Sequence, residues 1–277
     1  MVRPYTMKGH KRKKKSEEDK YDKEGEEEEE VAEEQPDGFD EKDDQGQEEE
    51  AVHEMEGIPI GPSDRNTKKP GVIFVLEKAS LEVAKVGKNY QILNSDDHAN
   101  FLKRNNKNPG DYRPDIVHQA LLSILDSPLT KAGRLRAVYV KTEKSVLFEV
   151  KPHVRLPRTY KRFSGIMLQL LQKLSITAAG KREKLLRVIK NPVTQYLPVN
   201  SKKIGFSYSS EKLVKMRNHV ATISDDMDLV FVVGAMAHGK IETDYTDDLV
   251  AISGYPMSAA RCIARICEAL EDKWGIL

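Results

Sequence analysis

The stretch Leu229-Val-Phe-Val-Val-Gly-Ala-Met-Ala-His-Gly239-Lys240 decides the fold class, because an apolar, β-branched run passes directly into a glycine-rich loop. A short apolar run bounded by glycine is typical of a buried strand. Similar runs lie at residues 72–76, 135–141, 145–150, 185–189, 204–208 and 249–252. Apolar stripes at helical spacing lie at residues 114–125, 163–174 and 258–274. Short apolar strands that alternate with helices predict an α/β domain with a mainly parallel sheet.

The loop after residue 233 has the spacing G-x-x-x-x-G-K of a phosphate-binding loop, from Gly234 to Lys240. In such loops the next residue is Ser or Thr, whose hydroxyl binds Mg²⁺. Here the next residue is Ile241, and four acids follow within residues 242–248. The sequence therefore argues against a nucleotide triphosphatase. Two glycines after a strand instead predict that the backbone closely approaches a ligand or another loop.

The charges are sorted along the chain, although the formal net charge of its 277 residues is only +1. Residues 1–15 carry seven basic side chains and no acid, and residues 16–64 carry 23 acids against three lysines. From Lys68 onward, 34 basic and 21 acidic residues leave a net charge of +13. We expect residues 1–68 to be a disordered basic-then-acidic tail and residues 69–277 to be a folded domain. The positive charge of that domain favours a polyanionic partner.

Several classes of protein and site are not expected. The longest apolar run, residues 229–237, has nine residues and is too short to cross a bilayer. No apolar segment follows the basic residues near Met1, so secretion is not expected. Cys262 and Cys267 lie within one helical pattern and are expected to be core thiols. The seven histidines are scattered, so the sequence predicts no metal site.

Residues 150–182 contain no Asp or Glu, which makes this stretch the candidate nucleic-acid surface. The basic side chains of its first part are Lys151, Arg155, Arg158, Lys161 and Arg162. The guanidinium fork of arginine suits phosphate, and Tyr160 offers a ring on which a base can stack. This composition favours nucleic-acid binding over a solvated loop that serves only solubility.

Arg113 and Asp115 flank Pro114 where a helix is predicted to begin. Proline fits the first helical position, and a carboxylate there is stabilised by the helix N-terminus. From the residues alone, ordinary capping is the simpler explanation of this pair.

Five motifs together resemble one family. They are Arg113-Pro-Asp-Ile-Val-His-Gln119, Leu156-Pro-Arg-Thr-Tyr-Lys-Arg-Phe-Ser-Gly165, Val188-Ile-Lys-Asn-Pro-Val193, Phe231-Val-Val-Gly-Ala-Met-Ala-His-Gly239 and Ile252-Ser-Gly-Tyr-Pro-Met-Ser-Ala259. In order and content they resemble eukaryotic nucleolar ribosome-biogenesis methyltransferases of the SPOUT class, which methylate N1 of a pseudouridine in small-subunit (18S) ribosomal RNA. The resemblance covers residues 70–277. It implies a SPOUT-type α/β knot, with a C-terminal trefoil knot in a mainly parallel sheet flanked by helices.

The resemblance also implies which residues form the site. S-adenosyl-L-methionine is expected to bind in the knot loops. The implied cofactor-binding residues are Phe206, Gly234, Gly239, Lys240, Ile241, Ile252, Ser253, Gly254, Tyr255, Pro256 and Met257. Arg113 is the implied contact to the substrate RNA and Asp115 is its carboxylate partner, so both are candidate catalytic residues. Arg155, Arg158 and Arg162 are implied to grip the RNA hairpin around a flipped base.

The expected partners are small-subunit ribosomal RNA, a second copy of the chain in a homodimer, and other small-subunit assembly factors, with no membrane. The expected location is the nucleus and nucleolus, and the basic cluster at residues 9–15 is a candidate import signal or a solvated basic arm. A non-catalytic assembly factor that binds pre-ribosomal RNA remains the alternative. The presence of both cofactor loops favours the enzyme.

Overall fold

The structure is a computed structural model that describes residues 69–178, 180 and 182–276. The expected tail, residues 1–68, lies outside the described residues. None of the helices in the described residues is long and apolar enough to span a membrane.

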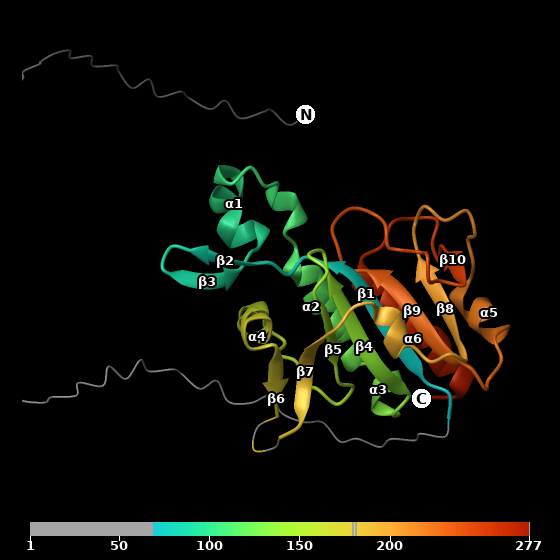
Figure 1. The fold of residues 1–277 in the computed structure, drawn as a ribbon. Coiled ribbons are helices and arrows are strands. Elements are labelled where there is room, and N and C mark those ends of the chain that lie inside the picture. The colour runs from blue at the N-terminus through green and yellow to red at the C-terminus, as the bar shows by residue number, and fades with distance from the viewer. Residues whose placement is uncertain (1–68, 179, 181, 277) are drawn as a thin grey trace, which may run out of the picture. The chain divides into compact units, whose positions relative to one another are not determined.

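An eight-stranded sheet in the order β10-β8-β9-β1-β4-β5-β7-β6 forms the centre of the domain (Figure 1). The parallel strands are β1 (Val72–Ala79), β4 (Leu135–Thr142), β8 (Ser201–Phe206), β9 (Asp228–Gly234) and β10 (Asp248–Val250). Three further strands, β5 (Leu147–Val150), β6 (Ser175–Thr177) and β7 (Lys184–Ile189), extend one edge in antiparallel fashion. The mainly parallel sheet is therefore confirmed, with an antiparallel extension that the sequence did not reveal.

The three expected helices are α2 (Pro114–Leu125), α4 (Tyr160–Lys173) and α6 (Ala259–Trp274). Pro114 is the first residue of α2, as its fixed φ favours. Ser258 caps α6, because its hydroxyl accepts a hydrogen bond from the backbone N–H of Arg261 at 3.3 Å. The short elements α3 (Pro128–Lys131), α5 (Met216–Ala221), η1 (Pro109–Asp111) and η2 (Val193–Tyr196) were not predicted.

Side chains of β1 alternate between two hydrophobic clusters, one on each face of the sheet. Val72, Phe74 and Leu76 pack into the larger cluster, which also contains the buried faces of α2, α4 and α6. Ile73 and Val75 pack into the smaller cluster on the opposite face, together with residues of η2 and the loop after β9. The central strands are therefore covered on both faces, as a parallel sheet requires.

A hairpin of β2 (Val83–Val86) and β3 (Asn89–Ile92), followed by α1 (Ser95–Arg104), is inserted between β1 and α2. Asn94 caps α1, because its side chain accepts hydrogen bonds from the backbone N–H groups of Asp96 and Asp97. The insert forms a small unit beside the end of β1 (Figure 1).

Both cysteines are buried on α6 with free thiols. Burial raises the pKa of Cys262 and of Cys267 to about 12. A thiol that remains protonated is a poor nucleophile, so the expectation of core thiols is confirmed.

Candidate cofactor and RNA site

A cavity of about 600 Å³ lies at the carboxyl ends of β8, β9 and β10. Its walls come from the ends of these three strands and the loops after them, from the first two turns of α2 and from the start of α6. This volume suits a small organic ligand, and open parallel sheets bind ligands outside the carboxyl ends of their strands. The topology of the sheet alone therefore predicts ligand binding in this cavity.

Most of the predicted cofactor residues line this cavity. They are Phe206, Gly234, Gly239, Lys240, Ile241, Ile252, Ser253, Tyr255 and Met257. Gly254 lines a neighbouring hollow beside α6, and Pro256 is exposed outside the lining of the cavity. The structure therefore brings together two loops that are separate in sequence, with these two residues set apart.

Five polar lining residues were missed by sequence reasoning: Gln119, Ser207, Tyr208, His238 and Ser258. Gln119 and His238 lie inside the motifs that carry the family resemblance, so motif membership was the available signal. Tyr208 follows β8 closely, and its proximity to a strand end was the only sequence cue.

The glycine-rich loop after β9 has a conformation that only glycine adopts easily. Gly239 has a φ of +110°, which residues with a Cβ rarely adopt. A Cβ atom on Gly234 would lie 2.8 Å from the sulfur of Met236, at the flexible end of a side chain that can move. The next residue after Lys240, Ile241, is buried in the smaller hydrophobic cluster, and residues 241–247 form coil and turn rather than a helix. The loop therefore lacks the magnesium-binding hydroxyl and the helix of a phosphate-binding loop.

The second loop, residues 251–258, is held by α6. Arg265 donates a hydrogen bond from Nη1 to the backbone oxygen of Ile252 at 3.0 Å. The backbone N–H of Tyr255 donates to Oγ of Ser253 at 3.0 Å, while the Tyr255 side chain is 82% exposed. The loop thus offers backbone groups and one free aromatic ring beside the cavity.

Arg113 and Asp115 form a bidentate ion pair at the cavity wall. Arg113 donates from Nε to Oδ1 of Asp115 at 2.8 Å and from Nη2 to Oδ2 at 2.7 Å. The hydrogen bonds from Arg113 lower the pKa of Asp115, and the carboxylate raises the pKa of Arg113. The arginine side chain makes no capping hydrogen bond to α2. The pair therefore fixes a cation at the cavity wall, and its carboxylate is a poor proton acceptor.

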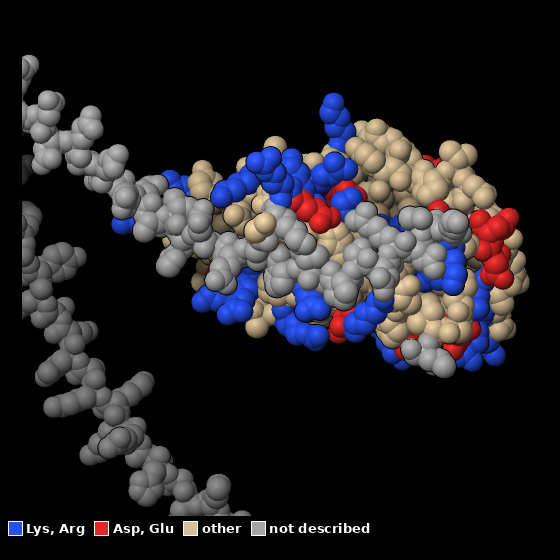
Figure 2. Space-filling model, turned by 90° about the horizontal axis from the view of Figure 1, so that it is seen from below, with Lys and Arg blue, Asp and Glu red and all other residues tan. Residues whose placement is uncertain are grey.

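The predicted RNA trio lies outside the cavity, in the loop before α4 and in the first turn of that helix. Arg155, Arg158 and Arg162 are all exposed. Val154 and Leu156 are buried on either side of Arg155, so the loop is anchored while this arginine faces solvent. On the face drawn in Figure 2, basic side chains gather at several places and acidic ones are fewer.

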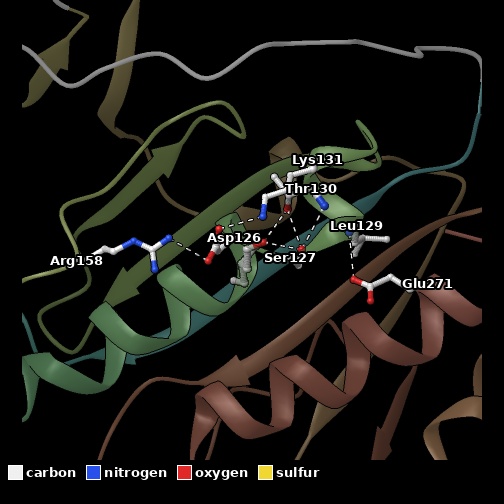
Figure 3. Close-up of polar contacts among 8 residues, drawn as sticks. Asp126, Ser127, Leu129, Thr130, Lys131, Arg158 and Glu271 are labelled. Carbon is white, nitrogen blue, oxygen red and sulfur yellow. Dashed lines mark hydrogen bonds and ion pairs between the residues drawn. The ribbon is translucent and has the colours of Figure 1, made fainter. Parts of the chain in front are cut away.

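The fold supplies the basic stretch with an acid that its own sequence lacks. Asp126, at the end of α2, lies 3.3 Å from Nη2 of Arg158 and 3.1 Å from Nζ of Lys131 (Figure 3). The absence of acids within residues 150–182 therefore does not leave Arg158 unpaired. Hydrogen bonds from Lys131 and the charge of Arg158 lower the pKa of Asp126, so the acid is ionised.

Tyr160 does not offer the free stacking surface that its sequence context suggested. Its ring is partly buried against the larger hydrophobic cluster, and burial raises its pKa to about 12. His118, on α2, lies 6.3 Å from this ring and stacks on Phe163 of α4 at 4.4 Å. Nε2 of His118 donates a hydrogen bond to the backbone oxygen of Pro157 at 2.8 Å. The buried histidine therefore joins α2 to the basic loop.

Within the described part of the chain, no group of three or more His, Cys, Asp and Glu side chains could hold a metal ion. The acidic residues around the start of β9 have structural partners. Asp228 accepts a hydrogen bond from the backbone N–H of Gly71 at 2.6 Å, and Asp225 lies 3.0 Å from Nζ of Lys273.

Comparisons with known proteins agree with this geometry. A family model described as EMG1/NEP1 methyltransferase matches residues 74–271. The mouse protein named ribosomal RNA small subunit methyltransferase NEP1 is 52% identical over 206 residues, which is 74% of this chain and 83% of the relative. The Caenorhabditis elegans protein of the corresponding name is 52% identical over 216 residues, covering 78% of this chain and 93% of the relative.

The comparison extends to an archaeal relative and to a solved structure. The Nep1 protein of Thermococcus kodakarensis is 31% identical over 186 residues, 67% of this chain and 83% of the relative. The crystal structure of Archaeoglobus fulgidus Nep1 bound to S-adenosylhomocysteine has a TM-score of 0.56 and 22% identity, covering 74% of this chain and 99% of that one. At this identity the likeness concerns the fold, and it confirms the SPOUT-type α/β architecture.

Proposed function

Because the chain belongs to the EMG1/NEP1 methyltransferase family, we propose that it methylates small-subunit ribosomal RNA with S-adenosyl-L-methionine as methyl donor. The observation that carries the proposal is one cavity that joins the two glycine-containing loops to the Arg113–Asp115 pair. The proposed target atom is N1 of a pseudouridine, as the family resemblance of the five motifs implies.

The residues of the cavity fit this cofactor. Phe206, Ile252 and Met257 would supply apolar surface for the adenosyl group, and Gly234 and Gly239 lie at the cavity wall. The φ of +110° at Gly239 favours glycine, which leaves the backbone of the loop open to a ligand there. The volume of about 600 Å³ lies within the range of small-molecule sites.

S-adenosyl-L-methionine, when bound, supplies an electrophilic methyl group. The acceptor nitrogen must release its proton to solvent water, so negative charge develops on the base. The guanidinium of Arg113, held by two hydrogen bonds from one side, is placed to orient the base and to stabilise that charge. Asp115 is a positioning residue in this scheme, because its lowered pKa makes it a poor general base.

Arg155, Arg158 and Arg162 would hold the phosphates of the RNA beside the cavity. Arginines on an anchored loop bind a polyanion and fix its position, while base identity is read elsewhere. His118 links this loop to α2, and Arg113 is the residue that immediately precedes α2. The helix therefore supports both the RNA-binding loop and the charge-stabilising group.

Calorimetry with S-adenosyl-L-methionine tests cofactor binding. Mass analysis of an RNA hairpin, after incubation with the protein and S-adenosyl-L-methionine, tests methyl transfer. A hairpin containing pseudouridine should gain one methyl group, and the matched hairpin with uridine should gain none. Absence of cofactor binding would refute the enzyme. Tight RNA binding without cofactor binding would favour the non-catalytic assembly factor instead.

The role of Asp115 is tested with Asp115→Asn. If Asp115 only positions Arg113, the shape of the pH–rate profile should match that of the unaltered protein while RNA affinity and rate fall together. A large loss of rate with unchanged RNA affinity would instead assign proton abstraction to Asp115.

We further propose a homodimer, association with other small-subunit assembly factors, and a nuclear and nucleolar location. The exposed apolar side chains of Leu213 and Tyr255, 61% and 82% exposed near the second loop, support an interface there. The basic cluster at residues 9–15 supports nuclear import and lies outside the described residues. Sedimentation of the full chain tests the dimer, and imaging of a tagged chain tests the location.

A further inference from the structure

The loop from residue 235 to residue 247 joins β9 to β10 and supplies the glycine-rich wall of the cavity. We call it the cofactor loop. A single residue of β1, Glu77, holds it near both ends. The backbone N–H of Ala235 donates to the backbone oxygen of Glu77 at 2.8 Å. The hydroxyl of Tyr245 donates to Oε1 of Glu77 at 2.6 Å, across 168 positions of sequence.

Glu77 is fully buried, although carboxyl groups seldom are. It lies beside Gly234 in the register between β1 and β9. Its Oε2 atom makes no hydrogen bond to any residue that the structure describes. Burial raises the pKa of Glu77, and burial together with the bond to Glu77 raises the pKa of Tyr245. The charged groups around it are Lys78 of β1, Lys141 of β4 and Glu242 of the cofactor loop.

A buried carboxyl with one unsatisfied oxygen destabilises a fold relative to an apolar residue of similar size. A destabilising buried carboxyl at the end of a strand, next to a binding loop, indicates that the carboxyl has a function in that loop. The middle of the loop offers little packing of its own, because His238, Gly239 and Lys240 are exposed. The buried Ile241 and the Tyr245 hydroxyl anchor the loop. An ion pair of Glu242 with Lys141 at 2.7 Å and backbone and side-chain hydrogen bonds between Asp247 and Lys203 anchor it as well.

We propose that Glu77 is a positioning residue for cofactor binding, which acts through Tyr245 to hold the cofactor loop in its binding conformation. The inference rests on the proposed function, since it assumes that this loop contacts S-adenosyl-L-methionine. It extends that function to a residue on another strand, outside the lining of the cavity.

The test uses Tyr245→Phe, which removes one hydroxyl and keeps the ring. Tyr196→Phe is the matched control, because Tyr196 packs against the same smaller cluster and its hydroxyl bonds to none of the described residues. Glu77→Gln is the conservative variant, because its amide oxygen can still accept the Tyr245 hydroxyl. Each variant of the full chain is titrated with S-adenosyl-L-methionine by calorimetry, and separately with an RNA hairpin.

Tyr245→Phe should weaken cofactor binding about ten-fold, as expected when a buried hydrogen bond is lost and its partner is left unpaired. The KM for the cofactor should rise by a similar factor, with kcat and RNA affinity nearly unchanged. Tyr196→Phe should match the unaltered protein, and Glu77→Gln should bind the cofactor more tightly than Tyr245→Phe does.

Equal cofactor affinity in Tyr245→Phe and in the unaltered protein would overturn the inference, even if the variant melts at a lower temperature. Glu77→Gln binding as weakly as Tyr245→Phe would also overturn it, provided that the variant remains folded. If the unaltered protein binds no cofactor, the proposed function itself fails, and the two failures are thus distinct.

Discussion

Replacing Asp126 with asparagine should strengthen RNA binding, because the change releases Arg158 from its ion pair (Figure 3). The side chains of Arg158 and Asp126 are 80% and 54% exposed, and their nearest polar atoms lie 3.3 Å apart. Solvent screens a pair this exposed, so separating it costs about 0.2–1 kcal/mol. A phosphate that no longer competes with Asp126 should therefore gain about 1.4- to 5-fold in affinity.

Fluorescence anisotropy of a labelled small-subunit hairpin, titrated at several salt concentrations, measures this gain. Asp272→Asn is the matched control, because it makes the same change in net charge at an exposed ion pair with Arg217 near the C-terminal end of α6. If Asp126→Asn binds no more tightly than Asp272→Asn, then Arg158 does not contact phosphate. The free energy of unfolding should fall by no more than about 1 kcal/mol, since Asp126 and its two partners are on the surface.

Three further outcomes are expected. Arg158→Ala should weaken RNA binding and reduce the slope of log affinity against log salt by about one, while calorimetry shows unchanged cofactor affinity. Gly239→Ala should weaken cofactor binding, because the φ of +110° at this position is strained for any residue with a Cβ. The control is Gly87→Ala, at a φ of +65° in the β2–β3 hairpin turn, which should leave the calorimetric cofactor affinity unchanged. Glu77→Gln should become more stable relative to the unaltered protein as pH rises above 4.5, the ordinary value of that carboxyl. The folded state raises the pKa of Glu77 and so binds more protons than the unfolded chain, which makes the penalty grow with pH. Urea unfolding from pH 4 to pH 8 measures the free energy of unfolding of both proteins. A difference between them that stays constant across that range would contradict a raised pKa of Glu77.

The elements that the sequence predicts well are those whose apolar pattern is set by burial on one or both faces. The run at residues 72–76 lies within β1, and the stripe from residue 114 to residue 125 matches α2. The β2–β3 hairpin was missed because its strands have four residues each and mostly half-exposed side chains, which leaves no clear alternation. The helix α1 could have been found, since Asn94 precedes two acids in its first turn and two basic residues occupy its last.

Site residues that lie in a sequence motif could be predicted, whereas those brought together only by tertiary contacts could not. Gly234 and Gly239 follow a strand, so their approach to a ligand could be inferred from spacing. The ion pair of Arg158 with Asp126 joins residues 32 positions apart, and no local pattern reports it. In the sequence Glu77 is only a polar residue near the end of a predicted strand. Its hydrogen bond with Tyr245 is visible only in the fold.

The helix α2 has a consequence for how the two ligands interact. Arg113 precedes its first turn at the cavity, His118 lies in its second turn beside the basic loop, and Asp126 follows its last residue and pairs with Arg158. Because these residues belong to one helix, a small rotation or tilt of α2 would displace Arg113 and the basic loop together. Substitutions that loosen the packing of α2 should therefore lower affinity for both ligands in proportion, and a first ligand that stiffens the helix should favour the second.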